Sequence, residues 1–336
     1  MKRVIEYRQL VQILILFMIV QFLGLTVAVL FYNTVPISIV SSALSAPTSI
    51  GVTIANVLFY IGMIVVFSFI LIIFSKRSSS GKFFYFVEAY ILFISTFFIF
   101  WVISRLVTNA SLFSIFGNSI TTSVVIAALL SVALIIAKNK WQKLRNSAAI
   151  LASAGVGTLL GISLPFYFAF IFMAFLAVYD FIAVFITKHM ITMAKAVSEK
   201  NLAFLIGVNE VEAVSRSDFS SNELKEYNKE KKLFAKQHTH EAKHIEALAG
   251  KGMVPVIARV ELGTGDLVMP LMVAVSAFPN IKLSFFIIFG AIFGLVLTMM
   301  ILKKYKRALP AIPPLLFGIS IGIGIYYLLH LSALIL

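Results

Sequence analysis

Nine long apolar runs determine what this chain can fold into. A helix needs about 20 mostly apolar residues to cross the hydrocarbon of a bilayer, and each run is close to that length. We therefore expect an all-α membrane protein, a polytopic bundle of about nine transmembrane helices. The runs lie at about 10–32, 50–74, 83–104, 119–137, 147–164, 166–187, 262–279, 284–302 and 312–336.

The composition of the 336 residues excludes a soluble globular enzyme. Hydrophobic residues make up 60% of the chain and charged residues only 12%, whereas a typical soluble domain is about 25% charged. A body of this size cannot hide so much apolar surface inside itself. The chain has no cysteine, which excludes disulfides, thiol nucleophiles, iron–sulfur clusters and thiolate zinc sites.

The basic residues outside the long polar segment indicate the orientation. With the N-terminus in the cytoplasm and nine spans threaded, four basic clusters fall on the cytoplasmic side, as the positive-inside rule requires. We expect a multi-pass protein of the plasma (cell) membrane with an external C-terminus. Its first run is expected to be a signal anchor instead of a cleaved signal peptide. The clusters are Lys2, Arg3 and Arg8; Lys76, Arg77 and Lys82; Lys138, Lys140, Lys143 and Arg145; and Lys303, Lys304, Lys306 and Arg307.

The acidic residues divide the chain into three parts. Ten of the 14 lie between Lys188 and Glu261, so residues 188–261 are expected to form a polar cytoplasmic loop. Residues 1–187 then carry the first six transmembrane helices, and residues 262–336 carry the last three. The four remaining acids are Glu6, Glu88, Asp180 and Asp266. Carboxyl groups inside apolar runs are costly and are usually functional.

Asp180 and Asp266 are expected at a similar depth on neighbouring helices. Asp180 lies eight residues before Lys188 and Asp266 lies five residues after Glu261, which places them ~12 Å and ~7 Å from the same face at 1.5 Å rise per residue. Two carboxyls that share a site cannot both ionise easily, so the pair holds a single proton. One acid can then activate a water while the other polarises a peptide carbonyl. This chemistry needs neither a metal nor a cofactor, and we expect none.

Three short motifs occur in a fixed order along the predicted spans. They are Tyr179-Asp180 in the sixth, Leu262-Gly263-Thr264-Gly265-Asp266 at the start of the seventh, and Ala308-Leu309-Pro310 before the ninth. In these motifs and in its layout the chain resembles the intramembrane aspartyl proteases of the presenilin and signal peptide peptidase family (the GxGD type), and it is most like a microbial, archaeal presenilin homologue. Thr264, where Leu is frequent, and Arg307, where presenilins usually have Pro, depart from the pattern.

The resemblance implies an aspartic endopeptidase that cleaves transmembrane segments of membrane proteins. It implies catalysis by Asp180 and Asp266. The expected partners are transmembrane-helix proteins or peptides as substrates and the lipid bilayer, with no nucleic acid, and a homo-oligomer is left open. The residues expected to bind substrate are Tyr179, Gly263, Thr264, Gly265, Ala308, Leu309 and Pro310.

The segment Val254–Val260 differs from the polar loop before it. It is rich in β-branched residues and leads directly to Asp266. A helix in lipid satisfies all its backbone groups internally, so it must unwind before its peptide bonds can be attacked. We expect Val254–Val260 to form a strand that captures the unwound segment by main-chain hydrogen bonds; an ordinary loop is the alternative.

Transport is the alternative function class. Buried carboxylates and glycine-broken helices also occur in proton- or cation-coupled carriers and leak channels, but no inverted repeat is visible and the three motifs stay unexplained. The segment from His240 to His244 fits the His-Glu-x-x-His zinc pattern. It has no evident third ligand, so we expect a solvated loop. Glu88, near the start of the third run, is expected to snorkel to the interface.

Overall fold

The structure is a computed structural model of the chain. It describes residues 7–34, 62, 82–108, 111–115, 118–141, 144–186, 205–215, 253–278, 280–305 and 310–335. The expected span at 50–74 and the segment from His240 to His244 lie outside the described residues, apart from Gly62.

Eight α-helices occupy the other eight apolar runs. Seven of the described helices are long and apolar enough to cross a membrane. The eighth, α11, has only 13 residues. The helices are α1 (Tyr7–Thr34), α4 (Lys82–Val107), α5 (Thr122–Lys140), α6 (Arg145–Ser163), α7 (Phe166–Phe181), α11 (Thr264–Ser276), α12 (Ile281–Tyr305) and α13 (Ile312–Ile335). Pro165 is the N-cap of α7, so the predicted break between the fifth and sixth spans is confirmed.

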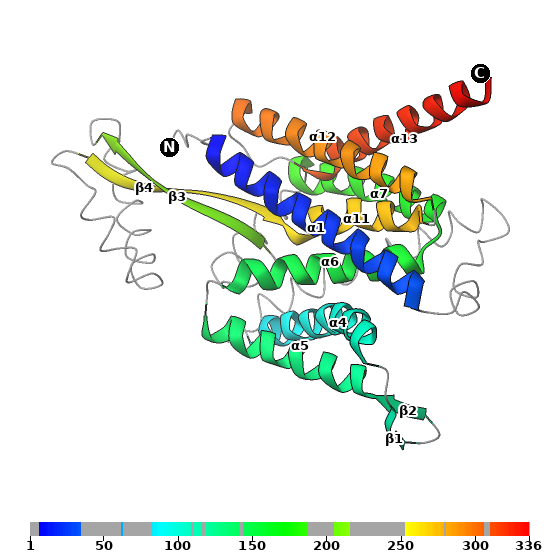
Figure 1. Ribbon diagram of the computed structural model, residues 1–336. Helices are drawn as coiled ribbons and strands as arrows, with labels where there is room; N and C mark the ends of the chain where they lie inside the picture. Colours follow the sequence, from blue (N-terminus) through cyan, green and yellow to red (C-terminus); the bar gives the residue numbers. More distant parts are fainter. Residues whose placement is uncertain are drawn as a thin grey trace.

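Helix α11 forms the centre of the bundle. It contacts α1, α6, α7, α12 and α13, and every side chain from Leu271 to Val275 is completely buried. Figure 1 shows α4 and α5 on one side of it and α12 and α13 on the other. Helix α1 begins at the end of the bundle from which the long β-ribbon projects, and α13 ends at the other. The short helix is therefore held by its neighbours instead of by lipid.

Glycines allow the closest helix contacts. A Cβ built on Gly290 would lie 2.4 Å from the carbonyl oxygen of Gly318, and one built on Gly318 would lie 2.1 Å from that of Gly290. The backbones of α12 and α13 therefore touch where these residues cross. On α6, a Cβ at Gly157 would lie 2.7 Å from the side chain of Leu271. Small residues have this role where membrane helices pack tightly.

The described residues also form two antiparallel pairs of strands. Strands β1 (Ser111–Ile115) and β2 (Asn118–Thr121) join α4 to α5. Strands β3 (Leu205–Ser215) and β4 (Met253–Gly263) pair without a bulge from Leu205↔Gly263 to Ser215↔Met253. The expected strand at Val254–Val260 is thus part of β4, and its β-rich composition explains why. The sequence did not predict β3, which pairs with it.

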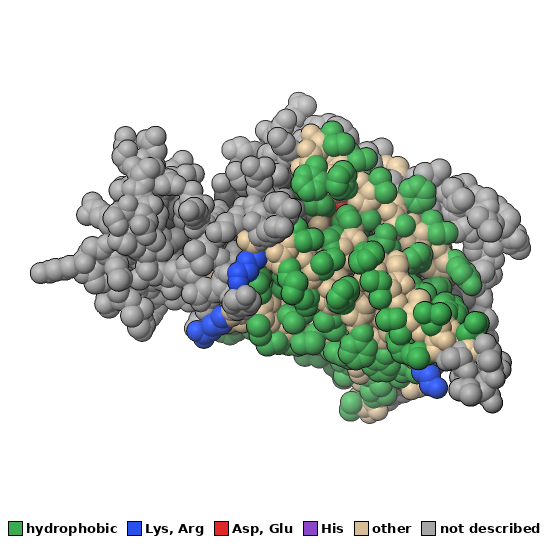
Figure 2. All heavy atoms as spheres, turned by 90° about the horizontal axis from the view of Figure 1, so that it is seen from above, with side chains coloured by type: hydrophobic (Ala, Val, Ile, Leu, Met, Phe, Trp, Pro, Cys, Tyr) green, Lys and Arg blue, Asp and Glu red, His purple; other side chains and the backbone are tan. Residues whose placement is uncertain are grey.

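The expected position of Glu88 is wrong. Its side chain is 2% exposed and forms an ion pair of 2.6 Å with the Lys138 Nζ of α5. A cation on the neighbouring helix gives this carboxylate a partner inside the bundle, so it does not have to reach the interface. Elsewhere, large apolar side chains such as Leu129 and Phe289 are more than half exposed. Figure 2 shows one face on which hydrophobic side chains predominate among the described residues, as a surface in contact with lipid requires.

Candidate active site

Helix α7 brings Asp180 to its last turn. The helix is almost entirely apolar, and the Asp180 side chain is only 7% exposed. A five-residue π-helical segment, Ile182–Ile186, follows directly; such wide turns are frequent at functional sites. Tyr179, beside it in the sequence, is half-buried.

The first amide groups of α13 point at Asp180. The Ile312 N–H donates a hydrogen bond of 3.2 Å to its Oδ2, and the Ala311 N–H donates to the same carboxyl group. The first N–H groups of a helix have no partner within the helix, and they favour a negative charge. Pro310, which directly precedes them, is buried. Ala308 and Leu309 lie outside the described residues.

Asp266 is the third residue of α11. Its carboxyl group accepts a hydrogen bond from the backbone N–H of Gly263, the N-cap residue. An acidic side chain at this position commonly reaches back to the amide that opens the helix. A Cβ on Gly263 would lie 3.3 Å from Oδ2 of Asp266, closer than such atoms normally approach. Glycine at 263 therefore gives the carboxyl group its room.

Gly265 leaves a free space beside Asp266. A Cβ built on Gly265 would meet no atom within 4 Å, and the residue is exposed. Packing within the described part of the chain therefore does not demand glycine there. Thr264, between the two glycines, is half-buried. A second polypeptide could approach Asp266 from this side.

The two carboxyl groups lie near each other in the region where α7, α11 and α13 come together. Asp180 is near enough to Asp266 for their charges to repel each other, and α7 and α13 both contact α11. The third acid in the described helices, Glu88, binds Lys138 instead. No cluster of three potential metal ligands occurs in the described part of the chain. Two carboxyl groups that share one proton could act together in acid–base catalysis.

Sequence reasoning did not single out two polar side chains that hold the surroundings of this site. Gln21 of α1 donates to the Leu267 carbonyl of α11, and Asn146 of α6 binds the backbone of Gly207 in β3. The sequence offered one signal for Gln21, a polar amide within the apolar run 10–32. It offered no comparable signal for Asn146, which follows a basic cluster.

Comparison with known proteins identifies the family. The family model described as signal-peptide peptidase, presenilin aspartyl protease matches residues 14–331. The chain belongs to this family. This signal-peptide peptidase and presenilin family member is therefore a multi-pass membrane protein and an aspartic endopeptidase of the intramembrane type, as the motifs predicted. The carrier or leak-channel alternative is not favoured.

Solved structures show the same fold. The family member is similar to a presenilin family intramembrane aspartate protease in a C222 crystal form, with a TM-score of 0.57 and 20% identity over 95% of this chain and 99% of that chain. A presenilin family protease in a P2 crystal form gives a TM-score of 0.55 and 21% identity over 94% and 96% of the two chains. Among curated proteins, none matches.

Proposed function

We propose that the protein hydrolyses peptide bonds within transmembrane segments of membrane proteins, with Asp180 and Asp266 as its catalytic acids. One observation supports the proposal: the carboxyl groups of Asp180 on α7 and Asp266 on α11 are near enough to interact electrostatically, and the amides that open α13 bind Asp180. Their mutual repulsion favours a state in which the pair shares one proton. In that state one carboxylate and one carboxylic acid are available at the same time.

The reaction follows from this shared proton. The ionised Asp takes a proton from a water, whose oxygen attacks the scissile carbonyl carbon while the protonated Asp donates to the carbonyl oxygen. The tetrahedral intermediate then collapses, the C–N bond breaks, and the amine leaves with a proton from the pair. The amides of Ala311 and Ile312 hold Asp180 in place, and the space beside Gly265 admits the substrate backbone.

Cleavage of a single-span substrate by purified protein in liposomes tests the proposal. Asp180→Asn and Asp266→Asn should each abolish cleavage, because neither acid can be replaced by the other. Peptide-like transition-state analogues with a hydroxyl group should inhibit the native protein. Ser320→Ala is a suitable control, since among the residues that the structure describes this exposed hydroxyl of α13 bonds only to Leu316 of its own helix. Cleavage that persists in either Asn variant would contradict the proposal.

We also propose that the unwound substrate adds as a strand to the outer edge of β4. The side-chain amide of Asn146 makes two bonds to the Gly207 backbone, 2.8 Å to its carbonyl and 3.4 Å from its N–H. Asn146 thus occupies the outer edge of β3 at this point. Gly207 is paired with Glu261. Because both backbone groups of Gly207 bond to Asn146, they form no hydrogen bonds to β4, and the backbone groups of Glu261 also point away from β3.

The uninterrupted register extends this assignment along β4. Backbone groups alternate in direction along an antiparallel pair, so the N–H of Ile257 points outward and that of Val260 points to β3. Pro255 lies two residues before Ile257, so its nitrogen also points outward, and the N–H that proline lacks is not one that would bond to β3. Within the described part of the chain, the outer edge of β4 therefore pairs with no further strand, and its donors and acceptors lead directly to Asp266.

Two proline substitutions separate the role of this edge from the stability of the ribbon. Ile257→Pro removes an outward N–H and should reduce cleavage while the ribbon stays paired. Val260→Pro removes a bond to β3 and should loosen the ribbon itself. Amide exchange of β3 distinguishes the two, because only Val260→Pro should expose it. Full cleavage by Ile257→Pro would contradict strand addition at this edge.

We further propose the complete layout. The chain crosses the plasma membrane nine times, with a cytoplasmic N-terminus and an external C-terminus. Residues 1–187 form the first six spans, residues 188–261 a cytoplasmic loop, and residues 262–336 the last three spans. The four basic clusters support this orientation. The chain has no native cysteine, so single cysteines can test it. An impermeant thiol reagent should label Asn118→Cys in intact cells and Lys140→Cys only after permeabilisation.

A further inference from the structure

Gln21 places an amide group in the apolar interior of the bundle. The side chain is completely buried on α1, and its Nε2 donates a hydrogen bond of 2.9 Å to the carbonyl oxygen of Leu267. Its Oε1 is also buried and has no hydrogen-bond partner in the described part of the chain. An apolar side chain of similar size would fill this volume without leaving an acceptor unsatisfied. The hydrogen bond to Leu267 is therefore what Gln21 provides that an apolar side chain of the same size would not.

The carbonyl that Gln21 binds belongs to a turn of α11 that precedes a proline. Leu267 directly follows Asp266, and Pro270 lies inside the same helix. Proline has no N–H to offer the carbonyl of Asp266, four residues before it, and its ring crowds that carbonyl. In a membrane helix, groups from neighbouring helices stabilise such a turn. Gln21 supplies a donor to this turn one residue from Asp266.

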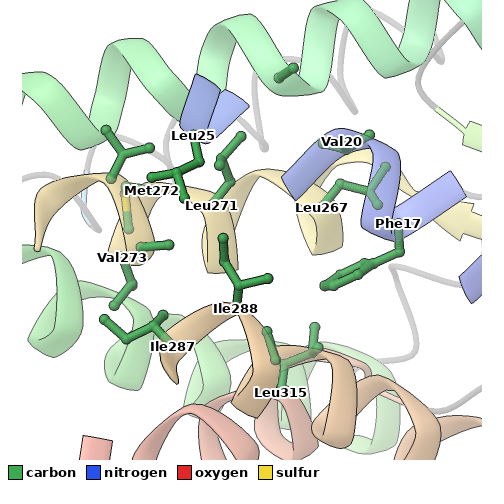
Figure 3. Packing of buried hydrophobic residues seen from close by; sticks show 14 of the residues in the cluster. Phe17, Val20, Leu25, Leu267, Leu271, Met272, Val273, Ile287, Ile288 and Leu315 are labelled. Carbon is green, nitrogen blue, oxygen red and sulfur yellow. The ribbon is translucent and has the colours of Figure 1, made fainter. Parts of the chain in front are cut away.

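The apolar contacts around this bond fix its register. Figure 3 shows Phe17 and Val20 of α1 beside Leu267, and Leu25 beside Leu271 one turn further along α11. A Cβ built on Gly24 would lie 2.3 Å from the Leu271 Cδ2, so the two helices are in close contact there. Because α1 cannot slide along α11, the amide of Gln21 meets the same carbonyl each time the chain folds.

We infer that Gln21 is a positioning residue for Asp266: its hydrogen bond to the Leu267 carbonyl fixes the first turn of α11, and with it the orientation of the Asp266 carboxyl group toward Asp180. This inference rests on the proposed function of the two acids. Small displacements of a reacting group have large effects on rate, of the order of 100-fold for 1 Å. Strand addition at β4 does not use the Leu267 carbonyl, and the bond lies one residue from Asp266, so its loss should affect kcat more than KM.

The test compares Gln21→Met with Thr158→Val in the liposome cleavage assay. Gln21→Met keeps the volume and removes the donor. Thr158→Val also removes one buried bond between helices, that from Oγ1 to the Gly24 carbonyl, but that bond joins α6 to α1 and does not touch α11. Gln21→Met should lower kcat roughly 10- to 100-fold, with a much smaller change in KM. Thr158→Val should lower the melting temperature but leave kcat near that of the native protein.

Gln21→Asn provides a second reading if Gln21→Met does not fold. It keeps the amide but withdraws it by one methylene, so the same loss of kcat is expected. A native kcat in whichever variant folds, or an equal loss in Thr158→Val, overturns the inference. The Asp180→Asn and Asp266→Asn variants separate the two levels: if they still cleave, the proposed function fails, and if they are inactive while Gln21→Met is fully active, only this inference fails.

Discussion

At the scale of the residue, main-chain amides hold both acids of the candidate site. Asp180 accepts from Ala311 and Ile312 and Asp266 accepts from Gly263. Such donors are fixed by the helix that carries them, so they can orient a carboxyl group without the rotamer freedom of a side chain. The effect of each amide can therefore be tested by changing the backbone.

Ile312→Pro should lower kcat. Proline is tolerated at the first position of a helix, where its missing N–H would have no partner within the helix, but here that N–H is the donor to Asp180. A hydrogen bond to a charged group contributes about 1.5–3 kcal/mol, so a loss of roughly 10- to 100-fold in cleavage rate is expected. Ile312→Val, which keeps the donor, is the control, and equal rates for the two variants would refute the role of this amide.

Gly263→Ala and Gly265→Ala should have different effects. At 263 the added Cβ lies 3.3 Å from the Asp266 carboxyl and must displace it by a few tenths of an ångström, so kcat should fall roughly tenfold. At 265 the methyl group enters free space. The free protein should accommodate it, and KM should rise because the substrate backbone approaches there. Steady-state kinetics of both variants measures the difference.

At the scale of the element, two kinds of contact hold pairs of helices together: backbones that touch at glycines, and a buried ion pair. Helices α12 and α13 touch through glycines, whereas α4 and α5 are joined by Glu88 and Lys138. The two devices differ in how they fail. A glycine contact is lost when an added methyl group forces the two backbones apart. An ion pair is lost when one of its two charged side chains is replaced by an uncharged one.

Gly318→Ala should destabilise the protein, because the new methyl group would lie 2.1 Å from the Gly290 carbonyl oxygen. Overpacking of this kind costs about 1–3 kcal/mol. Gly324→Ala on the same helix meets no atom within 4 Å, so it should be neutral or slightly stabilising. Thermal unfolding in detergent compares the two, and an equal melting temperature for both would show that α12 and α13 can separate without cost.

Lys138→Met should destabilise the protein by about 3–5 kcal/mol, because it removes the Lys138 cation from beside the buried Glu88 carboxylate. The double variant Glu88→Leu with Lys138→Met removes both charges and should recover most of the loss. Equilibrium unfolding of the single and double variants gives the coupling between the two residues. Additive losses would mean that the pair contributes no coupling energy.

At the scale of the whole molecule, the sequence predicted the features that depend on the length of apolar runs and on the order of motifs along the chain. The apolar runs locate eight described helices, and the order of the three motifs predicted the family. Contacts between distant segments could not be predicted in the same way. Nothing local in Gln21 indicates that it meets Leu267, 246 residues away, and Glu88 was assigned to the interface because Lys138 lies on another helix. The length of α11 was overestimated because its apolar run, 262–279, includes the last two residues of β4 and three residues beyond the end of the helix.

The shortness of α11 has a consequence for how water reaches Asp266. Its 13 residues rise ~20 Å, against about 30 Å of hydrocarbon in a typical bilayer, and five neighbouring helices enclose it. Lipid therefore does not have to adapt to the short helix, and the remaining depth is crossed inside the protein, where the strand β4 precedes the helix. Polar backbone thus leads to the first turn of α11 and offers water a route to the acid. The chain has no native cysteine, so Asp266→Cys should react with a small water-soluble thiol reagent, and a lack of reaction in folded protein would show that the route is closed.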